Sequence, residues 1–473
     1  MSLRRIQALV LTAASLLAVA AGGATLHGQA PARKRVALVI TNATVITEDA
    51  SRRILAPGAI AIDGVDIVGV DTPAAIAAAF QPRQTIDGSG QIVLPGLINT
   101  HGHAPMVLFR GLGSDLNLMD WLQQYIFPAE AKSVTPAFVR TGTQLAALEM
   151  IRSGTTTFTD MYYFEEEVAR AASEAGLRGV LGQTIIKFPV ADAKTPEEGL
   201  ARTERFIRQW KGNALITPAV APHALYTLEP ATLKACRALA DTHQVPLIIH
   251  LAETRAEVDT ALTLGNATPT KYLQSVGVWG PRTLAAHGVW VSPEDMVVLK
   301  AAGVAVSHNP ESNMKLASGT APVVDYLEAG ITVGLGTDGA ASNNDLDMFE
   351  AMRFAAFLQK HARNDPRALP ATAVLDMATR GGAAALGLGA QIGSVEVGKR
   401  ADVILVDTRG PRQTPMFDPV AHLVYSAHGD DVTTTIVNGK VLMRDRKVLT
   451  LNEAAVLTAA RAAAETVRAA VKK

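Results

Sequence analysis

The chain of 473 residues is 48% hydrophobic and 19% charged, which is typical of a well-buried globular enzyme and excludes a disordered protein. Lysine plus arginine and aspartate plus glutamate each total 44, so the formal charge of zero favours neither nucleic acid nor an anionic membrane surface as a partner. The single cysteine, Cys236, excludes an intramolecular disulfide and a cysteine-based metal site.

The first 30 residues have the pattern of a secretory signal peptide. The basic "MSLRR" precedes the apolar "IQALVLTAASLLAVAAGGA", and "GQA" before Pro31 resembles an A-x-A cleavage site. An uncleaved N-terminal anchor is the alternative, although the apolar run is short for a membrane span. No cysteine directly follows the run, which excludes a lipoprotein anchor. We expect an exported protein, periplasmic or secreted, that has no membrane contact after cleavage.

Short β patterns occur near both ends of the remaining chain. "VALVITNATVIT" alternates, and "AIAIDGVDIVGV" predicts two strands joined by a turn at Asp63-Gly64. "GSVEVGKRADVILVD" and "VTTTIVNGKVLM" again have the pattern of short strands, with a turn at Asn438-Gly439. We expect residues 31–94 and 389–450 to form one small composite β-sandwich domain, and residues 451–473 to form a surface helix that covers it.

Between these segments, short apolar runs alternate with helical patterns such as "TPAFVRTGTQLAALEMIRSG" and "EPATLKACRALADTHQ", as βα units and a parallel sheet require. Eight such runs end, in chain order, at His101, Asp160, Thr184, His223, His250, His287, His308 and Asp338. Eight βα units predict a (β/α)8 TIM barrel over residues 95–388, so the expected fold class is α/β.

The stretch "NTHGHAPMVLFRG" places His101 and His103 one residue apart, just after the apolar "IVLPGLI". Side chains repeat every second residue in a strand, so both imidazoles would face the same way. The strand ends of a barrel converge on one face, where this pair would meet His250, His287 and Asp338. A set of three imidazoles and one carboxylate suits zinc or a similar divalent cation, with a position left for water. Ordinary hydrogen-bonded core residues are the alternative.

Glu253 follows His250 in "IHLAET" and would add an acid that is free of metal. A bound cation lowers the pKa of its water, so that hydroxide exists near neutral pH. An unliganded carboxyl can then carry a proton to the leaving group. These residues together predict a metal-dependent hydrolase.

Longer motifs extend across the whole barrel. They are "PGLINTHGHAPMVLFRGLGSDLNLMDWL", "TPAVAPHALYT", "IHLAET", "AAHGVWV", "VSHNPESNMKLASG" and "GLGTDGAASNNDLDMFEAMR". In these motifs the chain resembles the amidohydrolase superfamily, and within it the 5-methylthioadenosine/S-adenosylhomocysteine deaminase and chlorohydrolase group. The flanking β segments resemble the composite sheet domain of that superfamily.

The resemblance implies a role for each polar side chain. The ligands of one divalent metal, Zn²⁺ or alternatively Fe²⁺, would be His101, His103, His250 and Asp338. The catalytic groups would be Glu253 as the proton shuttle, His287 as the residue that orients or deprotonates the metal water, and the ligand Asp338. The substrate-binding residues would be Glu130, which binds ribose hydroxyls, His223 and Trp121. A single metal is expected because relatives with two metals use a lysine or glutamate bridge, and "APH" ends the fourth strand here.

Two of these assignments have structural alternatives. Glu130 could be a first-turn helix carboxylate that the helix dipole favours. His223 could be a core histidine that donates to a backbone carbonyl. We expect His308 to be structural, because Asn309-Pro310 marks the start of a loop.

The resemblance predicts a hydrolytic deaminase that releases ammonia from an adenine-type nucleoside, namely 5-methylthioadenosine, S-adenosylhomocysteine or adenosine. The alternatives are deamination of guanine or a pterin, dechlorination of a triazine, and an inactive relative or binding protein. Arginines that hold the S-adenosylhomocysteine tail in the family have no counterpart in "LGQTIIKFPVADAKTPEEG", which offers Gln183, Lys187 and Lys194. Lysine lacks the bidentate fork of arginine. The expected partner is a small molecule, and a homo-oligomer is possible.

Overall fold

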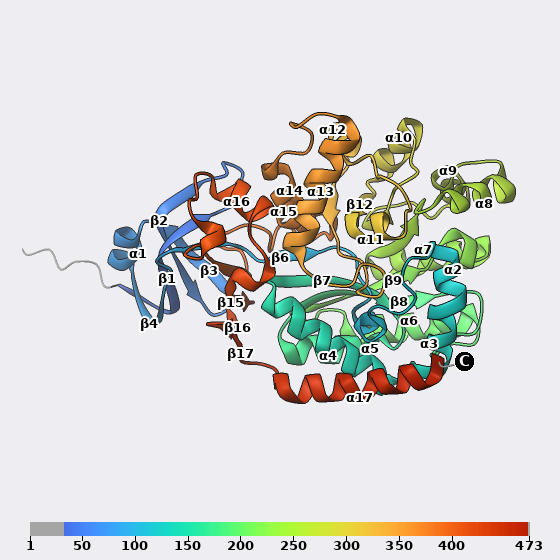
Figure 1. Cartoon of the computed structure of the whole chain (residues 1–473), viewed down its shortest axis with the longest axis horizontal. Coiled ribbons are helices and arrows are strands. Elements are labelled where there is room, and N and C mark those ends of the chain that lie inside the picture. The colour runs from blue at the N-terminus through green and yellow to red at the C-terminus, as the bar shows by residue number, and fades with distance from the viewer. Residues whose placement is uncertain (1–32, 472–473) are drawn as a thin grey trace, which may run out of the picture.

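The computed structural model describes residues 33–471, which form a barrel and, at one end of it, a mixed sheet (Figure 1). The predicted signal peptide at residues 1–30 lies outside the described residues. Across residues 33–471, no helix combines the length and the apolar content that a membrane crossing requires.

The barrel consists of eight parallel strands, each hydrogen-bonded to the next in chain order. Their bounds are β6 Leu97–Asn99, β7 Thr155–Tyr162, β8 Arg178–Ile185, β9 Ile216–Pro222, β10 Leu247–Leu251, β11 Thr283–His287, β12 Ala305–His308 and β13 Val333–Leu335. Nearly all of their residues are buried, as in parallel sheets that helices cover. The structure therefore confirms the predicted barrel.

Backbone hydrogen bonds just beyond the strands join the first strand to the last. The Thr100 amide donates to the Leu335 carbonyl, and the Asp338 amide donates to the His101 carbonyl, each at 3.0 Å. These bonds bring the segment after β6 against the segment after β13. Two residues that are far apart in the sequence, His101 and Asp338, thereby become neighbours.

Several helices of the barrel and of the sheet domain begin at recognisable signals. Threonine precedes proline at the start of α1, α4, α6 and α9, and in each case the threonine hydroxyl accepts from a backbone amide of the first turn. The main helices are α1 Pro73–Ala79, η1 Ala104–Phe109, α2 Leu118–Trp121, η2 Leu122–Ile126, α3 Phe127–Ser133, α4 Pro136–Arg152, α5 Glu165–Ala175, α6 Pro196–Trp210, α7 Pro230–His243, α8 Arg255–Gly265, α9 Pro269–Val276, α10 Pro293–Ala302, α11 Pro310–Lys315, α12 Val323–Glu328, α13 Met348–Arg363, α14 Ala371–Ala378, α15 Arg380–Ala385, α16 Pro419–Tyr425 and α17 Glu453–Val471.

The second sheet combines strands from both ends of the chain, as the sequence predicted, and its nine strands are joined into one mixed sheet. They are β1 Lys34–Ile46, β2 Ile54–Asp63, β3 Asp66–Asp71, β4 Phe80–Asp87, β5 Gln91–Pro95, β14 Val403–Asp407, β15 Val432–Val437, β16 Lys440–Arg444 and β17 Lys447–Val448. The two chain ends meet where β5 pairs antiparallel with β14. The predicted turns at Asp63-Gly64 and Asn438-Gly439 join β2 to β3 and β15 to β16.

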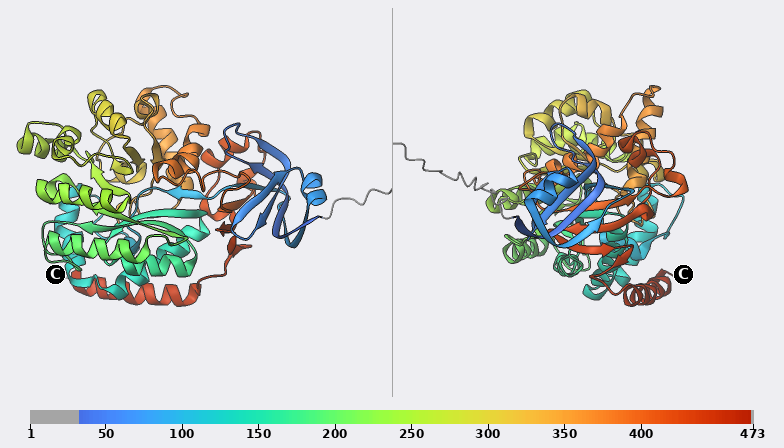
Figure 2. Two further views of the ribbon diagram at one scale, coloured as in Figure 1. Left: turned by 180° about the vertical axis from the view of Figure 1, so that it is seen from behind. Right: turned by 90° about the vertical axis from the view of Figure 1, so that its left-hand side faces the viewer.

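Helix α17 corrects one prediction, because it covers the barrel and not the sheet domain. It packs against α3, α4 and η1, and both views show it running along the barrel away from the sheet (Figures 1 and 2). Arg152 pairs with Glu453 at 3.1 Å at one end, and Lys132 donates to the Ala470 carbonyl at 2.9 Å at the other. An amphipathic pattern shows which face of a helix is apolar but not which surface receives that face.

Candidate active site

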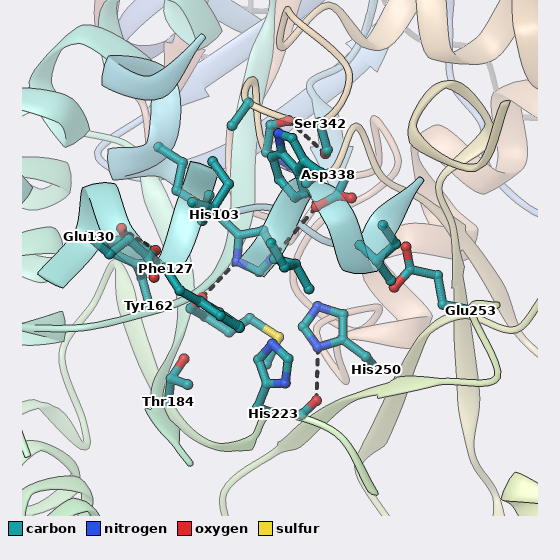
Figure 3. Close-up of a pocket in the computed structure, with 18 of the residues that line it drawn as sticks. His103, Phe127, Glu130, Tyr162, Thr184, His223, His250, Glu253, Asp338 and Ser342 are labelled. Atoms are coloured by element: carbon teal, nitrogen blue, oxygen red, sulfur yellow. Dashed lines mark hydrogen bonds and ion pairs between the residues drawn. The ribbon is translucent and has the colours of Figure 1, made fainter. Parts of the chain in front are cut away.

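A cavity of about 660 Å³ lies at the carboxyl ends of the barrel strands (Figure 3). In barrels of this type the active site forms at this face. The predicted site residues that line the cavity are His103, Trp121, Glu130, His223, His250, Glu253, His287 and Asp338. His101 is fully buried and lies in ring contact with His103, His250 and His287. The structure thus brings all nine predicted side chains to one place.

His101 and His103 lie beyond the end of β6 (Leu97–Asn99), so strand alternation is not what brings their rings together. The turn between them is held by the Met161 amide, which donates to the Gly102 carbonyl at 3.2 Å. The two rings stand edge to face, with centroids 4.9 Å apart. Hydrogen bonds to neighbouring strands therefore replace the strand geometry that the sequence predicted.

Two of the imidazoles have their tautomer fixed by backbone carbonyls. His103 Nδ1 lies 2.8 Å from the Met161 carbonyl, and His250 Nδ1 lies 2.8 Å from the His223 carbonyl. A carbonyl only accepts, so each Nδ1 carries a proton, and in the neutral form of each ring the lone pair is on Nε2. This is the arrangement in which histidine binds metals.

The candidate metal-ligating atoms of His101, His103, His250 and Asp338, here called the donor group, converge in the cavity. His101 Nε2 and His103 Nε2 lie 3.5 and 3.3 Å from Asp338 Oδ1. Within residues 33–471, neither ring nitrogen of His101 has a hydrogen-bond partner. Ligand atoms of His101, His103 and His250 lie within 4.8 Å of one another, as do those of His101, His287 and Asp338. Because buried polar atoms without partners are costly, the arrangement fits a divalent cation that these atoms coordinate.

The pKa shifts of the candidate metal ligands show which of them are ready to bind a cation. Burial lowers the pKa of His101 and of His250 well below the usual range, so both are neutral. Burial alone would raise the pKa of Asp338, but the His103 hydrogen bond and the nearby imidazoles hold it well below its usual range. Burial opposes protonation of His103, yet Asp338 raises its pKa to about 9. A proton on His103 therefore competes with a cation for Nε2.

Glu253 lies beside the donor group but outside the two sets of converging ligand atoms. Its backbone amide and that of Ala252 donate to the Glu257 carboxylate at 3.0 and 2.9 Å, which fixes the loop after β10. Glu253 Oε2 lies 3.8 Å from His287 Nε2. Burial raises the pKa of Glu253 above its ordinary value, which suits a group that must both hold and release a proton.

Glu130 lies on the other side of the donor group from Glu253 (Figure 3). It occupies the first turn of α3, and its Oε1 accepts from the Tyr162 hydroxyl at 2.7 Å. Burial raises the pKa of Glu130 to about 7, against the opposing effects of the Tyr162 hydrogen bond and the His103 charge. The side chain is 7% exposed and lines the cavity, so it is available to a substrate.

The structure also defines how His223 and Trp121 meet the cavity. His223 Nδ1 lies 3.0 Å from Thr227 Oγ1, whose own proton goes to the Ala224 carbonyl at 3.1 Å. The hydroxyl therefore accepts from His223 Nδ1, and His223 Nε2 keeps a lone pair. Trp121 Nε1 donates to the Leu112 carbonyl at 3.0 Å, so the indole offers the cavity its apolar ring.

Gln183, Lys187 and Lys194, the polar residues that the sequence offers in place of tail-binding arginines, do not line the cavity. Gln183 Nε2 donates to Asp192 at 2.9 Å, and Lys187 pairs with Glu229 at 3.1 Å. Among residues 33–471, no lysine or arginine lines the cavity.

Three residues that support the site were missed by the sequence analysis. Tyr162 ends the second barrel strand, where site residues gather, and Glu257 follows Glu253 by one helical turn. Asn313 accepts from His287 Nδ1 at 2.9 Å and lies in the quoted motif "VSHNPESNMKLASG". Their positions were visible in the sequence, but their partners were not.

A cation site beside an unliganded acid, set at the catalytic face of a parallel barrel, defines the class of metal-dependent hydrolases. Comparison with known proteins narrows this class, because residues 92–442 match the amidohydrolase family. The chain belongs to the amidohydrolase family.

Proteins of known structure and sequence resemble the chain over almost its whole length. It is 49% identical over 434 residues to a 5-methylthioadenosine/S-adenosylhomocysteine deaminase of Syntrophobacter fumaroxidans, covering 92% of this chain and 99% of that protein. An adenosine deaminase of Xanthomonas campestris with bound zinc has a TM-score of 0.91 at 38% identity, covering 93% of this chain and 100% of that chain. A zinc-bound atrazine chlorohydrolase of Arthrobacter aurescens has a TM-score of 0.84 at 27% identity, covering 90% and 100%.

Proposed function

We propose that the protein is a hydrolytic deaminase that releases ammonia from an adenine-type nucleoside. The observation that carries the proposal is the placement of two buried carboxyl groups on either side of the donor group, Glu253 beside His287 and Glu130 beside Tyr162. Ring deamination needs a carboxyl that moves protons, and a ribose needs an acceptor for its hydroxyls. The names of two similar proteins, both nucleoside deaminases, support the same reading.

The side chains divide the chemistry among them. One divalent cation per chain, which we propose to be zinc, would be held by His101, His103, His250 and Asp338 and would supply Lewis acidity for activation of the attacking water. Glu253 takes a proton from the attacking water and delivers it to N1 of the ring while the water oxygen bonds to C6. The proton of the C6 hydroxyl formed in this way then passes through Glu253 to the amino group, the C6–N bond breaks, ammonia leaves and the oxygen stays on C6 as a carbonyl. His287 Nε2, facing Glu253, accepts a hydrogen bond from the attacking water.

The 5′ end of the nucleoside should be uncharged. The cavity wall includes the apolar side chains of Leu118, Leu122, Ile126, Phe127 and Leu316. Since no lysine or arginine in the described chain lines it, the carboxylate of an S-adenosylhomocysteine tail finds no cationic partner there. Desolvating an unpaired carboxylate is costly.

An ammonia-release assay tests both parts of the proposal. The panel contains 5-methylthioadenosine, 5′-deoxyadenosine, adenosine, S-adenosylhomocysteine, guanine and a pterin, with chloride release from atrazine followed in parallel. We expect kcat/KM for 5-methylthioadenosine to exceed that for S-adenosylhomocysteine by about tenfold or more, corresponding to roughly 1.4 kcal/mol. Preference for guanine, a pterin or atrazine would refute the nucleoside assignment. Equal kcat/KM values for 5-methylthioadenosine and S-adenosylhomocysteine would refute the expected selectivity.

Glu130→Ala should raise KM for a nucleoside far more than KM for free adenine. A carboxylate that accepts from ribose hydroxyls makes charge-assisted hydrogen bonds worth roughly 1.5–3 kcal/mol each, and a free base makes none of them. KM for adenosine should therefore rise by about tenfold or more. Glu130→Gln keeps the volume and serves as the matched variant. Equal effects on adenosine and adenine would show that Glu130 is structural.

The pKa of Glu130 gives the same contact a pH dependence. Its pKa is raised to about 7, so the carboxylate that accepts the diol is lost as the pH falls through this region. A cation bound nearby favours the carboxylate, which puts the midpoint in the loaded enzyme at or below about 7. KM for adenosine, measured from pH 5 to 8, should fall as the pH rises, and Glu130→Gln should abolish this dependence.

We also propose that the protein is exported, on the basis of the signal-peptide pattern in residues 1–30. Cell fractionation of the full chain, with N-terminal sequencing of the product, tests this. Cleavage near Pro31 would support export, and an intact N-terminus in the cytoplasmic fraction would refute it.

A further inference from the structure

We propose that Asn313 is a positioning residue that fixes the tautomer and orientation of His287. His287 is 1% exposed and ends β11, and its Nδ1 lies 2.9 Å from Asn313 Oδ1. The two residues are 26 positions apart and come from different segments of the barrel face. This inference rests on the proposed function, which gives His287 its part in the reaction.

The hydrogen bond admits only one form of the neutral ring. Asn313 Oδ1 is a carbonyl oxygen that can only accept, so His287 Nδ1 must carry the proton. His287 Nε2 then keeps its lone pair on the side of Glu253, whose Oε2 lies 3.8 Å away. In the other tautomer two lone pairs would oppose each other at Asn313, and Nε2 would face the site as a donor.

Asn313 is well suited to this task because its own position is fixed. It is fully buried in α11, where its amide donates to the Asn309 carbonyl at 3.1 Å. Its carbonyl accepts from the Ser318 amide at 2.8 Å. The Ser318 carbonyl in turn accepts from Trp290 Nε1 at 2.8 Å, which ties this segment to the loop that follows His287.

The backbone of His287 fixes where the ring enters the site but not how the ring is rotated. His287 has a φ of 72°, in the left-handed region that residues with a Cβ rarely adopt. The next amide, that of Gly288, donates back to the Leu251 carbonyl at 3.0 Å and holds this turn. The backbone thus directs the ring into the site, and Asn313 sets its rotation and tautomer.

Only the oxygen of the Asn313 side chain is used by its neighbours. Within residues 33–471, Asn313 Nδ2 is buried and has no hydrogen-bond partner. Replacing this nitrogen by oxygen, as in Asn313→Asp, therefore breaks no contact and keeps the acceptor, although it buries a carboxyl group beside His287. Asn313→Leu has nearly the same shape and removes the acceptor. The two variants separate hydrogen bonding from packing.

The experiment compares both variants with the wild-type holoenzyme in deamination of 5-methylthioadenosine. Loss of a partner that orients a site histidine typically costs about 10–100-fold in activity. We expect kcat of Asn313→Leu to fall by that factor with KM nearly unchanged, and Asn313→Asp to recover much of the loss. Met314→Ala, an exposed neighbour on α11 that is absent from the cavity lining, is the control and should match wild type.

A second readout does not depend on turnover. ¹⁵N NMR of histidine-labelled protein should show His287 with the proton on Nδ1 in the wild type and in Asn313→Asp, and a mixture of tautomers in Asn313→Leu. Unchanged kcat and an unchanged tautomer in Asn313→Leu would overturn the inference. If the proposed activity itself fails, the tautomer comparison still decides the role of Asn313. If Asn313→Leu does not fold, Asn313→Ala, which also removes the acceptor, takes its place in both measurements.

Discussion

Glu253→Gln is expected to retain the metal and lose nearly all turnover. Glutamine has almost the same shape as glutamate and still forms hydrogen bonds, so the loop held by Glu257 and the substrate site should persist. It cannot carry a proton from the attacking water to the ring and on to the amine. General acid–base catalysis contributes roughly 10²–10⁴-fold, so kcat should fall by about that factor with KM little changed.

The decisive measurement is kcat together with metal content for the wild type and Glu253→Gln. Glu229→Gln changes an exposed carboxylate on the same barrel and should leave both values unchanged. If Glu253→Gln turned over within a fewfold of the wild type at full metal content, another group would have to move the proton. A variant that lost its metal would instead show that Glu253 belongs to the ligand set.

Removal of the cation is the second change with a very large expected effect. Dialysis against a chelator should abolish turnover, and one equivalent of Zn²⁺ per chain should restore it, because the reaction depends on Lewis acidity at the donor group. One equivalent is expected because "APH" ends the fourth barrel strand, where relatives with two metals have a bridging lysine or glutamate. Elemental analysis that finds two equivalents in active enzyme would contradict the single-metal assignment.

The matched variant for this experiment is His101→Ala. Within residues 33–471 neither ring nitrogen of His101 has a hydrogen-bond partner, so loss of the ring should leave the other hydrogen bonds of the site intact and remove one ligand. We expect a folded protein that neither holds zinc nor regains activity when zinc is added. Full metal binding by His101→Ala would show that the donor group has been assigned incorrectly.

Much of the fold and of the candidate site could be predicted from the sequence because both depend on local patterns. Apolar runs of strand length, each followed by a helical pattern, define βα units wherever the strands pair. The polar residues that end those runs, such as His250 and Asp338, are therefore placed at one face of the barrel by chain order alone. The motif "IHLAET" identified Glu253, and the resemblance to the amidohydrolase superfamily implied Glu130, although the surroundings of both residues could not be read from the sequence.

Other features were decided only by tertiary structure. The rings of His101 and His103 meet because of hydrogen bonds to other segments, since β6 ends before them. Helix α17 covers the barrel although its amphipathic pattern would fit another apolar surface equally well.

The hydrogen-bond partners of the site residues were also decided only by the tertiary structure. The acceptor for His103 Nδ1 lies 58 positions away, that for His287 Nδ1 lies 26 positions away, and the donor to Glu130 lies 32 positions away. The sequence by itself determined which chemical groups this protein carries and on which face of the barrel they gather. The packing of distant segments decided which side chains contact one another, and these contacts set the tautomer and the pKa of each site residue. The periodicity of a sequence cannot supply this, because it shows which face of a helix or strand is apolar but not which element packs against that face.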